Sequence, residues 1–194
     1  MTHLEKGISE SLTYNDYREL VANLLGQNKS TTKNGDESLV GYSKLNNSRM
    51  KRLDKTFKLD EEVKQKVKTI ENKVTWVVLT EGWCGDAAQN IPIINKIAEK
   101  NENIELKLVL RDENPELINE FLTNGNQSIP KLIQIEDGKV TKKWGPRPSI
   151  ATKMIADYKA EHGVVDAEIK KDLQLWYNKD KGLNTVDDIM ELLF

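Results

Sequence analysis

A run of apolar, mostly β-branched residues at 74–80 (Val-Thr-Trp-Val-Val-Leu-Thr) constrains the fold of this chain more than any other segment. Its apolar character is nearly continuous rather than alternating, as expected of a strand that is covered on both faces. A turn at 81–86 follows, and residues 87–100 then carry apolar side chains at helical spacing. We therefore predict a central strand that leads through a turn into a helix.

The segments that follow predict the rest of an α/β unit. We predict strands at 104–110, 131–136 and 139–144, and helices at 114–123 and 149–162. Asn114 and Pro115 form a typical helix start, and the Asp-Gly pair at 137–138 is a signal for a hairpin. The order β-α-β-α-β-β-α between about 74 and 162 indicates one compact unit of the α/β class.

Further helices are predicted on both sides of this unit. They lie at 13–26, 37–58 and 166–177, with a short helix capped by Asp60 and a terminal helix begun at Thr185. A polar stretch at 27–36 predicts an exposed loop. We expect an N-terminal helical extension (1–72) packed on the core, a central domain (73–163) and a C-terminal helical extension (164–194).

The helix at 37–58 carries a basic run that allows two interpretations. Arg49, Lys51, Arg52 and Lys55 lie between its apolar residues. Such a run is more often a solvated helix face than a binding patch, and we expect the former here.

The composition argues against several classes of function. Lys and Arg number 29 against 31 Asp and Glu, and the resulting net charge of −2 provides no overall positive field for a polyanion or an anionic membrane. The first ten residues lack the basic and apolar regions of a signal peptide, and no apolar run approaches the roughly 20 residues that span a bilayer. We expect a cytoplasmic protein that binds neither nucleic acid nor membranes.

The chain has one cysteine, Cys84, which rules out an internal disulfide and a cysteine-rich zinc site. The two histidines, His3 and His162, are far apart in the sequence. We therefore expect no metal site and no cofactor.

Cys84 lies where the central strand gives way to the helix. Unpaired backbone N–H groups and the positive end of the helix dipole at this point favour the thiolate. Asp86, two residues on, acts in the opposite direction because a nearby negative charge disfavours a second one. The sequence leaves the sign of the net pKa shift open.

Several features around Cys84 occur in a familiar order. Residues 83–87 read Trp-Cys-Gly-Asp-Ala, Pro92 follows eight residues after Cys84, an Ile-Pro pair at 129–130 precedes the hairpin, and Gly145 follows its second strand. Together they resemble the thioredoxin family, whose active site reads Trp-Cys-Gly-x-Cys. The resemblance covers roughly residues 74–162.

The resemblance implies a thioredoxin-like fold, which is a central mixed sheet flanked by helices, here with helical N- and C-terminal extensions. It also implies a cis Pro130 that faces Cys84. A closer similarity, to a bacterial group of thioredoxin-family proteins with this Trp-Cys-Gly-Asp-Ala motif, rests on residues 49–55, 81–86 and 144–148. It implies that the N-terminal helices belong with the fold.

Two departures from the family pattern bear on chemistry. Ala87 occupies the position of the second cysteine, so no thiol of the same chain can resolve a mixed disulfide. Val78 stands six residues before Cys84, where thioredoxins hold a buried carboxylate. The chemistry that remains is that of a monothiol, in which an external thiol completes the turnover.

The candidate catalytic residues are Cys84 as nucleophile and Asp86 as an acid or base, although a first-turn acid more often stabilises its helix. A lone cysteine is commonly a buried filler, but its place in this turn favours a partly exposed thiol. The candidate substrate-binding residues are Trp83, Gly85, Ile129, Pro130, Gly145 and Arg147. Trp83 could instead pack under the turn, and Arg147 could be an ordinary surface arginine.

Our first hypothesis is a monothiol thiol–disulfide oxidoreductase that uses Cys84 and acts on a protein or a low-molecular-weight thiol or disulfide. The alternative is a non-catalytic module that binds peptides or proteins in the same groove, or a redox sensor based on Cys84. The sequence leaves the oligomeric state open.

Overall fold

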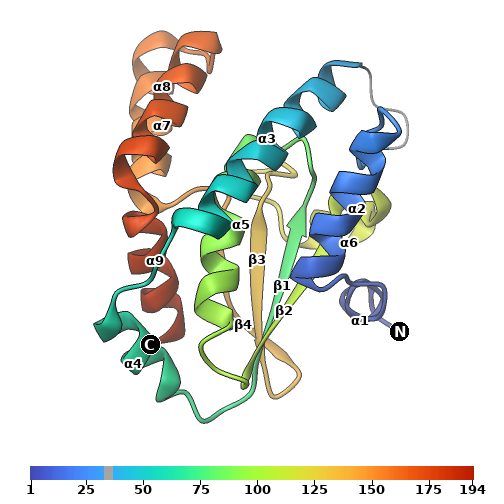
Figure 1. Cartoon of the computed structure of the whole chain (residues 1–194), viewed down its shortest axis with the longest axis vertical. Coiled ribbons are helices and arrows are strands. Elements are labelled where there is room, and N and C mark those ends of the chain that lie inside the picture. The colour runs from blue at the N-terminus through green and yellow to red at the C-terminus, as the bar shows by residue number, and fades with distance from the viewer. Residues whose placement is uncertain (33–36) are drawn as a thin grey trace.

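The computed structural model describes residues 1–32 and 37–194, and within them a four-stranded mixed sheet forms the centre of the protein (Figure 1). The strands are β1 (Val74–Thr80), β2 (Ile104–Leu110), β3 (Lys131–Glu136) and β4 (Lys139–Trp144), in the spatial order β2-β1-β3-β4. β1 runs parallel to β2 and antiparallel to β3, which pairs antiparallel with β4. The predicted α/β fold is confirmed, and all four strands begin and end at the predicted residues.

β1 is central because its side chains are apolar on both faces. Trp76, Val77 and Leu79 are completely shielded from solvent, and each such burial stabilises the fold by about 1.5–3 kcal/mol. The indole N–H of Trp76 donates to Oε1 of Gln134 on β3 at 3.0 Å, so the one polar atom of this side chain is also satisfied. The turn that follows β1 therefore begins from a strand that is fixed by the core.

The β3–β4 hairpin has the turn that its sequence predicts. Asp137 and Gly138 both adopt left-handed backbone conformations, with φ of 48° and 73°. Two consecutive positive φ angles are typical of the tight hairpin turn that Asp-Gly favours.

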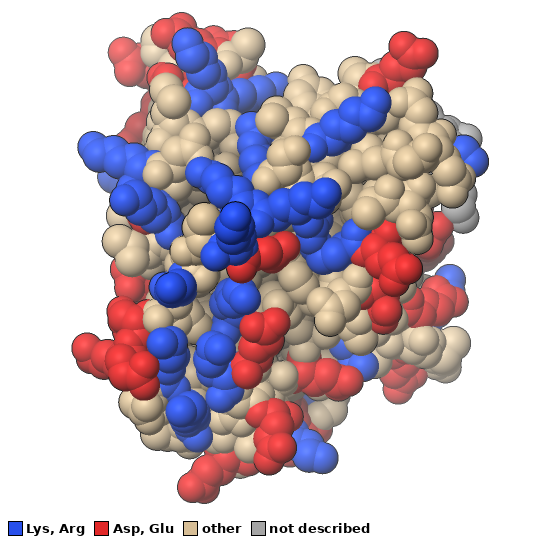
Figure 2. Space-filling view, viewed as in Figure 1, with Lys and Arg blue, Asp and Glu red and all other residues tan. Residues whose placement is uncertain are grey.

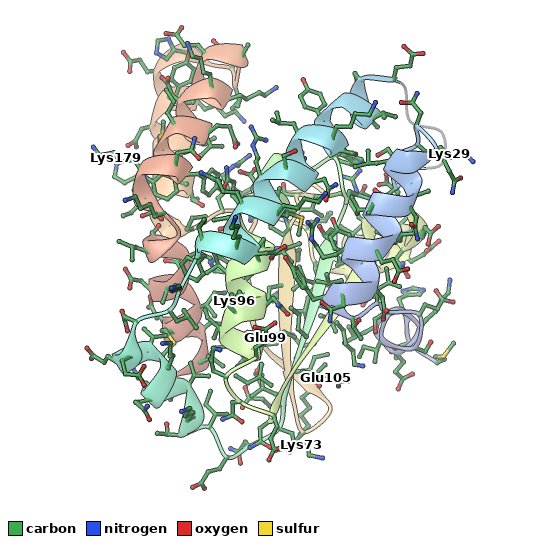
Figure 3. The ribbon with its side chains drawn as sticks, viewed as in Figure 1. Lys29, Lys73, Lys96, Glu99, Glu105 and Lys179 are labelled. Atoms are coloured by element: carbon green, nitrogen blue, oxygen red, sulfur yellow. The ribbon has the colours of Figure 1, made fainter. Side chains whose placement is uncertain are left out.

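Helices surround the sheet (Figure 1). They are α1 (His3–Ser9), α2 (Tyr14–Gly26), α3 (Glu37–Thr56), α4 (Glu61–Lys68), α5 (Gly85–Ala98), α6 (Pro115–Glu120), α7 (Ser149–His162), α8 (Ala167–Asp180) and α9 (Leu183–Leu193), with a 3-10 turn at Arg111–Glu113. α5 follows β1 and contacts both α3 and α9. Its far end carries an ion pair of 3.8 Å between Lys96 and Glu99, well away from the turn at Cys84 (Figure 3).

Several predicted helix ends agree with the structure. Thr13, Asp60 and Asp166 are N-caps whose side chains accept backbone N–H bonds, and Gly163 ends α7 in the left-handed conformation. The segment 33–36 of the predicted 27–36 loop lies outside the described residues, and of the rest Ser30 and Thr31 are buried rather than exposed.

Four helix starts differ from the prediction, and one of them is that of α5, which begins at Gly85, inside the predicted turn at 81–86. α1 was not predicted, and it begins with a reciprocal capping box between Thr2 and Glu5. α7 has Pro148 rather than Ser149 at its N-cap position. α9 begins at Leu183, because the Thr185 hydroxyl bonds Asn90 on α5 at 2.6 Å instead of capping a helix.

α7 and α8 form a helical pair that extends past the sheet (Figure 1). A small apolar cluster joins them, made of Ala151, Ile155, Ile169, Leu173 and Tyr177. α9, by contrast, contributes Ile189 and Leu192 to the main core together with the sheet and α5. The pair α7–α8 therefore stands beside α3 at the end of the sheet where β1 enters its turn.

Within residues 1–32 and 37–194, none of the helices is both long enough and apolar enough to cross a membrane.

Candidate functional site around Cys84

Cys84 caps the N-terminus of α5 and ends the turn that follows β1. Its backbone N–H donates to the carbonyl of Glu81 at 3.1 Å, which closes the turn. Its Sγ accepts the backbone N–H of Ala87 at 3.5 Å, one of the groups that a helix start leaves without an intrahelical partner. The strand end and helix start therefore place the sulfur at the positive end of the helix dipole.

The thiol is nevertheless buried. Cys84 is 8% exposed, and its Sγ donates to the carbonyl oxygen of Ile129 at 3.3 Å. The expectation of a partly exposed thiol was wrong, because α3 and α8 cover the turn. Side-chain atoms of Asn46 and Gln174 lie within 4 Å of where a Cβ on Gly85 would be.

Burial raises the pKa of the Cys84 thiol to about 12, and the nearby charge of Asp86 adds to the increase. The backbone N–H groups of Ala87 and Asp86 and the charge of Arg147 lower the pKa, but by less. This answers the question that the sequence left open: desolvation outweighs the helix N-terminus, and the thiol is held in its neutral form.

The Ile129–Pro130 bond is cis, as the resemblance implies, and it faces Cys84 through the Ile129 carbonyl. Gly145 lies on the other side of Pro130. It has a φ of 106°, and an added Cβ would collide with the Pro130 carbonyl oxygen. Only glycine fits at this position, so Gly145 allows the chain to pass close to the Pro130 carbonyl.

Asp86 is held by groups other than the thiol. Its carboxylate accepts the Tyr177 hydroxyl at 2.9 Å and forms an ion pair of 2.9 Å with Nε of Arg147. Asn90 joins the same group, donating to the Asp86 backbone carbonyl at 2.7 Å and contacting the Tyr177 hydroxyl at 3.1 Å. Burial raises the pKa of Asp86, although Arg147 and Tyr177 oppose the rise. Its catalytic role stays a prediction.

Trp83 both packs at the turn and borders a cavity, which are the two roles that the sequence allowed. Its indole N–H donates to Oγ1 of Thr32 at 2.7 Å, and the Arg111 guanidinium lies 4.9 Å from the ring centre. The ring is also partly exposed and lines a cavity. Trp83 therefore anchors the turn and forms part of a wall.

A buried carboxylate that the sequence analysis missed lies three residues before the cysteine. Glu81 is completely shielded, accepts the Thr31 hydroxyl, and accepts the backbone N–H of Asp112 at 2.9 Å. Burial raises its pKa to about 7, opposed by those two hydrogen bonds. The only available signal was an acidic residue placed directly after a buried strand.

A cavity of about 550 Å³ lies above the turn, between α3 and α8. Its wall contains Trp83, Cys84, Gly85, Asp86 and Arg147, so five of the eight candidate residues come together. Ile129 reaches the site through its carbonyl contact with Cys84, whereas Pro130 and Gly145 do not line the cavity.

The sequence analysis also missed Arg49, which belongs to the basic run on α3. Its Nη1 donates to Oδ1 of Asn46 at 2.8 Å, and Asn46 in turn donates to the carbonyl of Gly82 at 3.1 Å. Arg49 is half-buried and lines the cavity, whereas Arg52 is exposed and lies outside it. For Arg49, the predicted solvated face was wrong, because its guanidinium lies against Asn46 and the turn at Gly85.

Comparison with known proteins gives a family match and a fold match. A family model described as Thioredoxin matches residues 32–159, more than half of this chain. No curated protein is significantly similar in sequence. The similarity to a particular bacterial group stays a prediction.

Two solved structures resemble this chain over most of its length. The crystal structure of a protein of unknown function, PA1234 from Pseudomonas aeruginosa, has a TM-score of 0.59 at 14% identity and matches over 94% of this chain and 97% of that one. The crystal structure of an HIV epitope scaffold has a TM-score of 0.55 at 16% identity, over 94% and 98% of the two chains. At these identities the likeness concerns the fold alone.

Proposed function

This chain belongs to the thioredoxin family, and we propose that it acts as a ligand-binding module in which Cys84 is a neutral thiol at the base of the binding cavity. The observation that carries the proposal is the environment of the sulfur. It is buried, donates to the Ile129 carbonyl at 3.3 Å, and has a pKa raised to about 12.

A neutral thiol is a poor nucleophile, because the thiolate is the form that attacks disulfides. With a pKa of about 12, roughly one molecule in 10⁵ carries the thiolate at pH 7. The absence of a second cysteine at Ala87 removes the internal resolving step as well. Both features favour a binding role for this protein over catalytic thiol–disulfide exchange.

The cavity supports the binding part of the proposal. A volume of about 550 Å³ lies within the range of small-molecule sites. Its wall combines apolar side chains, such as Leu45 and Trp83, with charged groups that can orient a ligand, such as Arg49.

Alkylation by iodoacetamide across pH 6–10 tests the state of the thiol, since Cys84 is the only cysteine. We expect native protein to be almost unreactive below pH 8, and urea-unfolded protein to react with the ordinary thiol midpoint near about 8.5. The Cys84→Ala variant sets the background. Rapid alkylation of native protein below pH 8 would contradict the proposal.

A second candidate function, monothiol thiol–disulfide exchange, is favoured by one observation: Cys84 accepts the Ala87 N–H and lines the cavity. In that case the Cys84 thiolate attacks a disulfide, expels one of its thiolates, and is freed by an external thiol. Mixed disulfides would then accumulate on the native protein and be identified by mass spectrometry. Dimedone labelling after peroxide would instead indicate a sensor.

A further inference from the structure

The charges around the cavity above Cys84 are unbalanced. Its described wall includes Arg49, Arg147, Lys170 and Lys171, whereas Asp86 is its one acidic residue. Asp86 is already paired with Arg147 and bonded to Tyr177. Figure 2 shows Lys and Arg side chains gathered on this face over α3 and α8. The cavity is therefore locally positive although the chain as a whole carries −2.

The cavity also has an apolar side. Tyr42 and Leu45 on α3 are 57% and 49% exposed, and both line the cavity together with Trp83 and Leu173. Large apolar side chains left open to solvent beside a cavity mark a place where a ligand or partner is buried. A ligand for this cavity therefore needs an apolar part as well as a charge.

Arg49 is placed between these two sides. Asn46 holds its guanidinium in position at 2.8 Å and is itself fixed by the Gly82 carbonyl. Arg49 is half-buried, and a charge in such a position interacts with an opposite charge more strongly than a fully solvated one does. The first turn of α5, with its positive dipole, faces the same space through Cys84 and Gly85.

The size of the cavity favours a small molecule over an extended polymer as its ligand. The cavity holds about 550 Å³ and is bounded on two sides by α3 and α8, a volume in the range of small-molecule sites, which run from about 300 to 1,000 Å³.

We propose that this cavity binds a small organic anion that carries an aromatic or aliphatic group, with Arg49 as its main charge partner and the ring of Tyr42 and the side chain of Leu45 against its apolar part. This inference rests on the proposed binding function and names the chemical class of the ligand. Lys170 and Lys171 supply the surrounding positive charge.

Two fluorescent probes that differ in one group test the proposal. 8-Anilinonaphthalene-1-sulfonate carries an aromatic system and a sulfonate, and N-phenyl-1-naphthylamine carries the same aromatic system without the charge. We expect the sulfonate to bind the native full chain about tenfold more tightly than the neutral probe at low salt, and its affinity to fall as salt is added.

Variants on two helices locate the site. Arg49→Gln should weaken binding of the sulfonate by about tenfold and leave the neutral probe unchanged, whereas Arg49→Lys should restore part of the loss. Arg52→Gln is the matched control on α3, outside the cavity. On α8, Lys171→Gln should weaken binding, and Lys179→Gln, whose side chain lies outside the cavity (Figure 3), should not.

The outcomes separate this inference from the proposed function. Equal binding of both probes, unaffected by Arg49→Gln, would overturn the anionic ligand class while leaving a binding cavity in place. Binding of neither probe to folded wild-type protein, with its fold checked by circular dichroism, would also overturn the inference. A reactive Cys84 in the alkylation assay would overturn the proposed function instead.

Discussion

The hydroxyl of Tyr177 donates to the carboxylate of Asp86 across 2.9 Å, and this bond joins α8 to the first turn of α5. Tyr177 is buried, and the Asp86 side chain is 11% exposed. α8 therefore fixes the helix start that follows Cys84 from outside the sheet.

Replacement of Tyr177 by Phe should destabilise the protein. It leaves the Asp86 carboxylate with one donor fewer and removes one of the acceptors of the Asn90 amide, so we expect a loss of about 1–3 kcal/mol in the free energy of unfolding, measured by urea titration. Tyr158→Phe is the matched control, because Tyr158 donates to Asp166 at 2.8 Å but is itself only partly buried. Equal losses in the two variants would contradict a buried role for the Tyr177 bond.

Glu81 should make stability depend on pH. Its folded pKa is about 7 and its ordinary value is 4.5, so the folded state binds the proton more tightly. Stability therefore falls as pH rises from about 4.5 through 7, by up to about 3 kcal/mol. We expect urea unfolding at pH 5, 6, 7 and 8 to show this slope in the wild type and a flatter one in Glu81→Gln. Parallel slopes would mean that Glu81 does not titrate in this range.

Asp86→Asn should lower the pKa of Cys84. It removes the negative charge that, after burial, contributes most to the raised pKa of the thiol. Because the thiolate fraction increases as the pKa falls, we expect native Asp86→Asn protein to be alkylated several-fold faster than the wild type at pH 9. Asp172→Asn removes an exposed charge from α8 outside the cavity and should leave the rate unchanged. No difference between the two variants would show that the charge of Asp86 does not reach the sulfur.

Gly145→Ala should disturb the loop behind Cys84. The new Cβ would meet the Pro130 carbonyl in a backbone conformation that disfavours side chains, and we expect a loss of about 2–4 kcal/mol in stability. Gly138→Ala shares the positive φ but has open space around it, so about 1 kcal/mol is expected there. Thermal and urea unfolding compare the two. Similar losses would mean that the loop yields to the added methyl group.

Local sequence was sufficient for most of the fold. The strands at 74–80 and 131–136 begin and end at the predicted residues. The signals that predict them, a nearly continuous apolar run and an Asp-Gly turn, depend only on residues adjacent in the sequence. Helix ends at Asp60 and Gly163 followed for the same reason. Thr185 was assigned wrongly because its hydroxyl bonds Asn90, 95 residues away.

The sequence also predicted some residues of the candidate site and missed others. The order of motifs placed Trp83, Cys84 and Arg147 in one site, and the structure puts all three on one cavity wall. Arg49 and Glu81 were missed because nothing near them in sequence shows that Arg49 faces the turn at Gly85 or that Thr31 bonds Glu81.

The protonation state of the Cys84 thiol was decided by the tertiary structure. Local sequence places Cys84 at a helix start, where backbone N–H groups favour the thiolate. Its pKa is a sum of opposing contributions, and the largest of them, desolvation, comes from the helices that pack over the turn and from the loop that carries Ile129. Burial is a property of segments distant in sequence, so the sequence located the sulfur and the packing of those segments set its charge.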